Sequence, residues 1–133
     1  MEVLDREYRL TARNVQFYDG KEMKMKHKFL SDVCAETGVT RRAIQGYEQA
    51  GLVAAIGKNK CGYLIYDETR VERIRTIRFF QKIGFSIKEI QMIIDAPPDY
   101  QKEVLLNQIE KLEVHRKELS ELIQKTQAYI SSL

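Results

Sequence analysis

The sequence predicts a mainly α-helical fold with one small β-hairpin and one long helix at its C-terminal end. Apolar residues recur at helical spacing over much of 29–133, and helix-capping residues and glycines divide them into segments. Two short apolar stretches around a basic, Gly-containing segment predict the single hairpin. Residues 99–133 contain no Gly or Pro. We therefore expect three parts: an N-terminal extension over 1–28, a compact domain over 29–96 and a long helix over 97–133.

Length and composition exclude several classes of protein. The chain has 133 residues, of which 44% are hydrophobic and 31% charged, enough apolar material for one core with charged outer faces. No apolar run approaches the roughly 18 residues of a membrane span, and the acidic start of the chain is unlike a signal peptide. We therefore expect a cytoplasmic protein with no membrane partner. Cys34 and Cys61 form neither a CxxC pair nor a disulfide framework, so we expect small buried side chains.

Positive charge is concentrated in one short stretch of the chain. The formal net charge of +3 is too small by itself to indicate a nucleic-acid partner. Between residues 41 and 60, however, Glu48 is the only acidic residue. The cations of this stretch are Arg41, Arg42, Lys58 and Lys60. We therefore expect the binding surface here.

The N-terminal extension, residues 1–28, shows no helical periodicity. Its segments NVQFY and KEMKMK alternate polar and apolar residues around Asp19-Gly20, which is a hairpin signal. We therefore predict a hairpin arm. The alternative is a leader without fixed structure, whose lysines form only a solvated charged run.

Two short helices separated by a tight turn follow the extension. We expect Ser31 to cap the first helix and Gly38 to end it, because glycine adopts the left-handed conformation without strain. Thr40 caps the second helix, which ends at Gly51. Helix, short Gly-containing turn and helix is the layout of a DNA-reading helix-turn-helix, although any small αα corner fits the same pattern.

A basic hairpin and two further helices complete the compact domain. Apolar stretches on either side of residues 57–60 predict a hairpin with a basic tip, and such a hairpin after a helix-turn-helix is a wing. Asp67 caps the next helix, which ends at Gly84. Ser86 and Glu89 form the capping box of a fourth helix.

The last segment carries an apolar stripe suited to a partner helix. At 1.5 Å per residue, a helix over 99–133 would be about 50 Å long, which exceeds the needs of so small a core. Its apolar residues recur every seven positions in two rows, which predicts a coiled-coil dimer. The residues expected at the dimer interface are Leu105, Ile109, Leu112, Leu119, Ile123 and Ile130. The alternative is a helix that folds back onto its own domain, but the four shorter helices offer too little surface to cover it.

The order of these elements resembles the MerR family of bacterial transcriptional regulators. The resemblance covers about residues 29–133. It rests on FLSDVCAETGVTRRAIQGYEQAGLV for the helix-turn-helix and on CGYLIYDETRVERIRTIRFFQKIGFSIKEIQMII for the wing strand and the helices after it. The resemblance implies a winged helix-turn-helix followed by a long antiparallel coiled-coil dimerisation helix. It also implies a homodimer that binds a pseudo-palindromic promoter site in double-stranded DNA, with RNA polymerase as a further partner at the promoter.

The resemblance also assigns candidate residues by position. Arg42 falls at the start of the recognition helix, Tyr47-Glu48 matches the end of an Arg-x-Tyr-Glu signature, and Gly62-Tyr63 matches the wing. The basic stretch and the start of the fourth helix, where backbone N–H groups attract phosphate, add further positions. The expected DNA-binding residues are Thr40, Arg41, Arg42, Gln45, Tyr47, Lys58, Lys60, Tyr63, Ser86 and Lys88.

Two positions depart from the family pattern. Family members usually carry arginine where this chain has Gln45 and Leu64. Arginine grips a phosphate with a fixed fork of donors, whereas glutamine is neutral and leucine offers no donor. We therefore expect weaker anchoring on the DNA backbone than in relatives.

Catalysis and cofactor binding have little support in the sequence. His27 lies in the basic leader and His115 on the long helix, so neither forms a nucleophile and base pair with a cysteine. Neither cysteine has a second soft ligand near it in sequence. We expect no catalytic residue, no metal and no cofactor. Two alternatives to a regulator stay open: a dimeric protein-interaction adaptor that has lost normal DNA reading, and an architectural DNA-binding factor.

Overall fold

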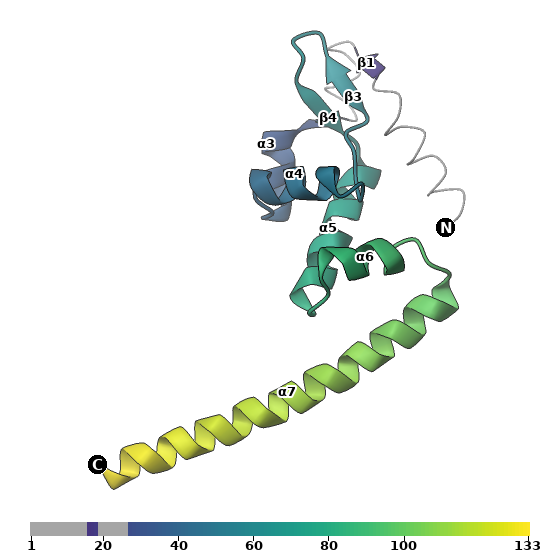
Figure 1. The fold of residues 1–133 in the computed structure, drawn as a ribbon. Coiled ribbons are helices and arrows are strands. Elements are labelled where there is room, and N and C mark those ends of the chain that lie inside the picture. The colour runs from purple at the N-terminus through teal and green to yellow at the C-terminus, as the bar shows by residue number, and fades with distance from the viewer. Residues whose placement is uncertain (1–15, 19–26) are drawn as a thin grey trace. The chain divides into compact units, whose positions relative to one another are not determined.

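The computed structural model describes residues 16–18 and 27–133, and the chain divides into two compact units, Met1–Asp95 and Ala96–Leu133. The elements of the first unit are β1 (Gln16–Tyr18), β2 (Lys28–Phe29), α3 (Leu30–Thr37), α4 (Arg41–Gln49), β3 (Gly57–Asn59), β4 (Leu64–Tyr66), α5 (Glu68–Lys82) and α6 (Ile87–Ile93). The second unit is the single helix α7 (Pro98–Ser132), drawn in green to yellow in Figure 1. The predicted mainly helical fold with a winged helix-turn-helix is confirmed.

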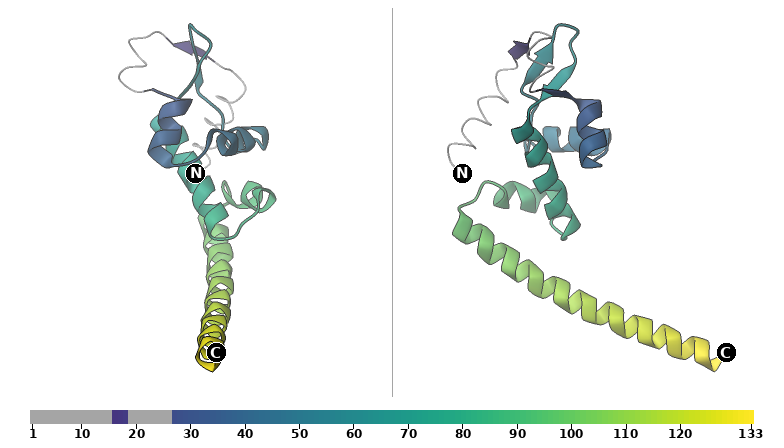
Figure 2. Two further views of the ribbon diagram at one scale, coloured as in Figure 1. Left: turned by 90° about the vertical axis from the view of Figure 1, so that its left-hand side faces the viewer. Right: turned by 180° about the vertical axis from the view of Figure 1, so that it is seen from behind.

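The hairpin of β3 and β4 lies at the centre of a four-stranded sheet with the strand order β1-β3-β4-β2. β4 pairs antiparallel with β3 and with β2, and β1 pairs parallel with β3. The chain that precedes α3 therefore supplies a strand to each edge of the wing, as the views in Figure 2 also show. The KEMKMK half of the predicted hairpin arm lies outside the described residues, so that hairpin stays a prediction.

One hydrophobic core joins the helices of the first unit to the wing. Its largest fully buried side chains are Tyr47, Tyr66, Ile44, Ile65, Ile74, Ile77, Ile90, Val33 and Val71. They come from α3, α4, β4, α5 and α6. Burying an aliphatic side chain of this size stabilises the fold by about 1.5–3 kcal/mol, so the core is sufficient to hold the short α4 in place.

The predicted caps of α4, α5 and α6 are confirmed. Thr40 Oγ1 and Asp67 Oδ1 each accept a hydrogen bond from the backbone N–H three residues later, at 3.1 and 3.0 Å. Ser86 and Glu89 form the reciprocal capping box, with hydrogen bonds of 3.2 and 3.1 Å. Each bond satisfies an N–H group that helix geometry leaves unpaired. Local side chains therefore fix where these three helices begin.

The predicted start of α3 is wrong. Ser31 does not cap this helix, because α3 already begins at Leu30. The Asp32 carboxylate, in the first turn of α3, accepts a hydrogen bond from the backbone N–H of Phe29 at 3.0 Å. This bond satisfies a backbone N–H at the helix start. β2 ends at Phe29, so the chain passes directly from strand to helix and leaves no room for a cap at residue 31.

The turn of the wing lies further along the chain than expected. The sequence predicts a tip at residues 57–60, whereas the turn occupies residues 60–63. Asn59 Oδ1 accepts hydrogen bonds from two backbone N–H groups of this turn, at 3.0 and 2.9 Å. Gly62 has a φ of 83°, a conformation that favours glycine. Cys61 belongs to this turn and is exposed, so the prediction that it is buried is wrong.

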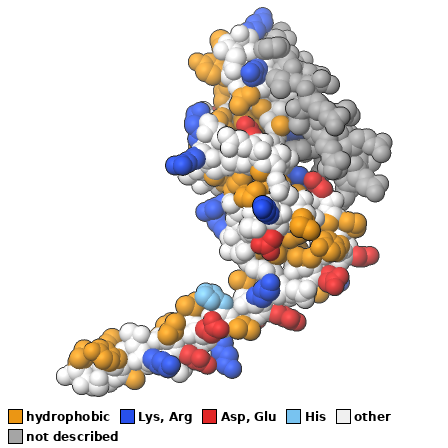
Figure 3. All heavy atoms as spheres, in the orientation of Figure 1, with side chains coloured by type: hydrophobic (Ala, Val, Ile, Leu, Met, Phe, Trp, Pro, Cys, Tyr) orange, Lys and Arg blue, Asp and Glu red, His pale blue; other side chains and the backbone are white. Residues whose placement is uncertain are grey.

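Helix α7 exposes most of its apolar side chains, whereas Val104 and Leu105 near its start are half-buried. It has no buried residue, and Leu112 and Ile123 are 40% and 58% exposed. Hydrophobic side chains recur along it in Figure 3. No helix among the described residues is both long and apolar enough to span a membrane. Most of the residues predicted for the dimer interface are exposed in the described chain.

Alanine substitutions at Gly38 and Gly46 test whether the turn of the helix-turn-helix requires a glycine. Gly38 ends α3 with a φ of 73°, Gly46 lies inside α4, and a Cβ added at either position meets no atom within 4 Å. Gly38→Ala should lower the free energy of unfolding by about 1 kcal/mol, because alanine is strained in the left-handed region. Gly46→Ala should raise it by about 0.5–1 kcal/mol, because alanine is the better helix former.

Chemical denaturation of the two variants measures both changes. The two substitutions add the same methyl group to open space, so each controls for the other. Effects of the same sign would contradict this account of the turn.

Candidate nucleic-acid interface

Helix α4 has one buried face and one exposed face. Ile44 and Tyr47 are its buried residues, and they pack into the core. Arg41, Arg42 and Gln45 are exposed, and all three belong to the N-terminal half of the helix. The start of α4 therefore presents two guanidinium groups and one amide to solvent.

Tyr47 attaches α4 to α5. Its side chain is 2% exposed, and its hydroxyl donates a hydrogen bond to Gln81 Oε1 at 2.6 Å. Burial raises the pKa of Tyr47, and the nearby Arg78 guanidinium only partly offsets this effect. Since the ring is in the core and the hydroxyl is bonded to α5, Tyr47 has a structural role, and its predicted DNA contact stays a prediction.

Glu48 attaches α4 to the wing. The hydroxyl of the fully buried Tyr66, in β4, donates a hydrogen bond to Glu48 Oε1 at 2.5 Å. Burial raises the pKa of Glu48, and the hydrogen bond from Tyr66 lowers it by less. Neighbouring side chains of one motif thus connect α4 to two different elements.

Two backbone carbonyls at the end of α4 and just after it are also held. Gln91 Nε2, from α6, donates to the Ala50 carbonyl at 2.7 Å, and Arg73 Nε, from α5, donates to the Leu52 carbonyl at 2.8 Å. The same guanidinium makes a bidentate contact with Asp95, at 2.5 and 2.8 Å. The C-terminal end of α4 is therefore attached to its neighbours, while the polar side chains of its N-terminal half face outward.

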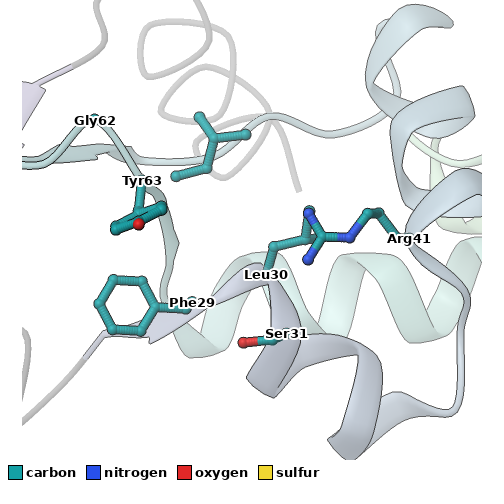
Figure 4. A pocket seen from close by; sticks show the side chains of 7 residues that line it. Phe29, Leu30, Ser31, Arg41, Gly62 and Tyr63 are labelled. Carbon is teal, nitrogen blue, oxygen red and sulfur yellow. The ribbon is translucent and has the colours of Figure 1, made fainter.

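A groove of about 510 Å³ lies between the start of α4 and the wing (Figure 4). Its lining residues are Phe29, Leu30, Ser31, Arg41, Gly62, Tyr63 and Leu64. The Tyr63 ring, which is 64% exposed, meets Phe29 edge to face with 6.1 Å between ring centroids. Figure 4 shows the Arg41 side chain extending from α4 toward this groove. The structure thus brings together two predicted site residues, Arg41 and Tyr63, in a mainly apolar groove with one cation.

The other predicted site residues occupy three exposed places. Lys58 lies in β3 and Lys60 in the wing turn, and both are exposed. Ser86 and Lys88 are exposed at the start of α6, although the Ser86 hydroxyl already accepts the capping bond. The same holds for Thr40 at the start of α4. In Figure 3, Lys and Arg side chains follow the left-hand edge of the first unit, from the wing to the helices below it.

A second set of charged residues forms an ion-pair network instead of an open surface. Lys28 contacts Glu36 at 2.6 Å and Glu68 at 3.1 Å, and Arg75 contacts Glu36 at 3.3 Å and also Glu72. These pairs join β2, α3 and α5. The acids in this network offset its cations, so this side of the unit is a poor surface for an anionic ligand.

Several residues that shape the site carry little signal in the sequence. Gln81, Tyr66 and Gln91 hold α4, yet they lie 18 to 41 residues from their partners in the chain. Phe29 lines the groove, and its only signal is an aromatic residue next to the first helix. Among residues 16–18 and 27–133, no three His, Cys, Asp or Glu side chains come together as a metal site.

Two family models match the chain. Residues 30–97 match a model described as "MerR HTH family regulatory protein". Residues 71–133 match a second model, described as "MerR, DNA binding". Together the two models cover the helix-turn-helix, the wing and α7.

Several characterised proteins are similar in sequence. Nodulation protein NolA of Bradyrhizobium sp. (strain NC92) is 31% identical over 85 residues, which are 64% of this chain and 35% of that protein. The HTH-type transcriptional activator mta of Bacillus subtilis (strain 168) is 30% identical over 102 residues, 77% of this chain and 38% of that protein. The HTH-type transcriptional regulator CueR of Salmonella typhi is 28% identical over 96 residues, 70% of each chain. The chain thus spans little more than a third of the length of the first two relatives.

Two solved structures share the fold. The N-terminal part of the Bacillus subtilis multidrug transporter activator, MtaN, aligns with a TM-score of 0.62 and 28% identity over 77% of this chain and 97% of that one. HiNmlR, a MerR family regulator lacking the sensor domain and bound to promoter DNA, aligns with a TM-score of 0.63 and 15% identity, over 74% of this chain and 79% of that one. At that identity the second comparison shows the fold alone.

Glu48→Gln separates the structural role of Glu48 from its charge. Glutamine keeps an oxygen that accepts the Tyr66 hydrogen bond, but it buries no carboxylate. The pKa of Glu48 is raised in the folded chain, so the folded state binds the proton more tightly than the unfolded state does. The stabilising contribution of protonated Glu48 is therefore lost as the pH rises from its ordinary value of 4.5 through the raised pKa.

Relative to the unmodified chain, Glu48→Gln should therefore gain stability as the pH rises through this window. Urea denaturation at a series of pH values measures the difference in the free energy of unfolding. The control is Glu121→Gln, at an exposed position of α7. A stability difference that is the same at every pH would contradict the proposed burial of the Glu48 carboxylate.

Proposed function

The chain belongs to the MerR family of helix-turn-helix regulatory proteins, and we propose that it regulates transcription as a homodimer on a pseudo-palindromic promoter site. One observation carries the proposal. Three side-chain hydrogen bonds hold the C-terminal end of α4 against α5, the wing and α6, and a fourth holds the chain just after it. The polar side chains of the N-terminal half of α4 are exposed. A helix whose C-terminal end is held by its neighbours and whose N-terminal side chains are exposed is suited to enter the major groove of DNA by its N-terminal residues.

In this proposal, the exposed face of α4 reads the bases. Arginine makes bidentate contacts with guanine, and glutamine makes them with adenine. Arg42 and Gln45 are exposed on the same half of α4 and are the candidates for these contacts. The neutral Gln45 would then help to select the DNA sequence, whereas an arginine at this position would bind a phosphate.

In this proposal, the wing and the groove beside it contact the sugar-phosphate backbone of the DNA. Lys58 and Lys60 are exposed cations on the wing and would neutralise phosphates. Arg41 would bind a phosphate at one side of the groove, while the exposed ring of Tyr63 would pack against the neighbouring sugar. At the start of α6, Lys88 would supply the charge for a further phosphate contact beside Ser86.

The dimer in this proposal forms through α7. The exposed apolar rows of this helix would pack against a second copy in an antiparallel coiled coil, which places two recognition helices on two half-sites. RNA polymerase at the promoter would be the further partner, and the cytoplasm the place of action. Exposed cations on both α4 and the wing support this function over an adaptor that has lost DNA binding.

Duplex binding should weaken steeply as salt increases. Two protomers with three or four phosphate contacts each give a log-log slope of about −5 to −7, from roughly 0.9 per phosphate. Lys58→Ala should reduce the slope by about 0.9 per protomer, whereas Lys117→Ala, at an exposed position of α7, should leave it unchanged. Fluorescence anisotropy over a salt series measures each slope. A slope near zero, or no binding at low salt, would overturn the proposed function in favour of an adaptor.

The dimer should depend on one face of α7 only. Leu112→Lys combined with Leu119→Lys places charges in the apolar rows and should give a monomer that no longer binds a two-half-site duplex. Val114→Lys adds the same side chain outside those rows, at a position that is 58% exposed, and should remain a dimer. Light scattering at micromolar concentration measures the mass. An unmodified chain that is already monomeric under these conditions would refute the proposed interface.

A further inference from the structure

Strand β1 covers one edge of the wing with residues that precede the helix-turn-helix. It pairs parallel with β3 in the register Gln16↔Gly57, Phe17↔Lys58 and Tyr18↔Asn59. In Figure 1 it lies beside β3 at the end of the unit where the wing turns. The family model begins only at residue 30, so this strand is an addition to the matched domain.

The backbone of Lys58 is directed toward β1. Within β3, the Asn59 N–H donates to the Tyr63 carbonyl at 3.0 Å, so the backbone of Asn59 faces β4. Successive peptide groups of a strand point to opposite sides, and the N–H and C=O of Lys58 therefore face the other edge. In the observed parallel register, these two groups meet the Gln16 carbonyl and the Tyr18 N–H.

This pairing matters because the wing is short. β3 and β4 have three residues each, and β2 adds only two residues at the far edge, so these strands alone form a very small sheet. Without β1, the peptide groups of Lys58 would form an open sheet edge. The Lys58 side chain is exposed, so the strand leaves its ammonium group accessible while restraining the main chain that carries it.

We propose that β1 is a positioning strand for Lys58: it fixes the main chain from which this lysine reaches a DNA phosphate, and so contributes to DNA affinity. The inference rests on the proposed function. Its predicted effect is confined to one contact per protomer, because β1 pairs with β3 alone in the observed sheet.

Two proline substitutions one residue apart test the inference. Tyr18→Pro removes the N–H that faces Lys58, whereas Phe17→Pro removes an N–H that points away from β3, and both restrict the backbone equally. Tyr18→Pro should weaken duplex binding by about fivefold, no more than Lys58→Ala does, and should reduce the salt slope by up to about 0.9 per protomer. Phe17→Pro should have a clearly smaller effect on both quantities.

Two further measurements separate positioning from general damage to the fold. In a Lys58→Ala background, Tyr18→Pro should produce no further loss of affinity, because the contact that it positions is absent. The backbone amide of Lys58 should exchange with solvent faster in Tyr18→Pro than in Phe17→Pro. Equal effects of the two prolines, or a loss that persists without Lys58, would overturn the inference and leave the proposed function intact. Failure of the unmodified chain to bind duplex would overturn both.

Discussion

The hydrogen bonds of Tyr47 and Glu48 are the interactions on which the rest of the structure depends. Both side chains belong to the last turns of α4, and they bind Gln81 of α5 and Tyr66 of β4. Removing one partner of such a bond leaves a buried polar group unsatisfied, which costs about 1–3 kcal/mol. These two bonds therefore hold α4 in a defined position relative to α5 and the wing. In the proposed function, the DNA must fit that arrangement.

The same constraint divides the cations of the first unit into two groups. Lys28, Arg73 and Arg75 have acidic partners and hold elements of the scaffold together. The cations of α4 and the wing, among them Arg42 and Lys58, are exposed. The net charge of +3 is therefore a poor measure of the local positive charge, because acidic residues are few in the stretch of chain that carries the exposed cations of α4 and the wing.

Much of the fold is predictable because side chains cap the helices through hydrogen bonds to residues close in the sequence. Features that depend on contacts between residues far apart in the chain are not predictable in this way. Thr40 and Ser86 cap their helices through bonds that close within three residues, so their sequence neighbours are sufficient to identify them. A motif match does not reveal that the Tyr47 side chain faces inward, because its hydrogen-bond partner Gln81 lies 34 residues away in the chain. The sequence pattern places the wing turn too early, because it does not show that the Asn59 side chain bonds the backbone of the later turn. The pairing of β1 joins residues about forty positions apart and has no local signal.

Site-directed cleavage of DNA tests most directly whether the open face of α4 is the recognition surface. A cleavage reagent attached through Gln45→Cys, with Cys34→Ala and Cys61→Ser removing the native thiols, should cut bound duplex at defined positions within each half-site. The same reagent at Thr69→Cys, an exposed position beside Glu68 in the ion-pair network, should cut weakly or not at all. Strong cleavage from residue 69 together with none from residue 45 would contradict the account, because the DNA would then lie against the ion-pair network and not against α4.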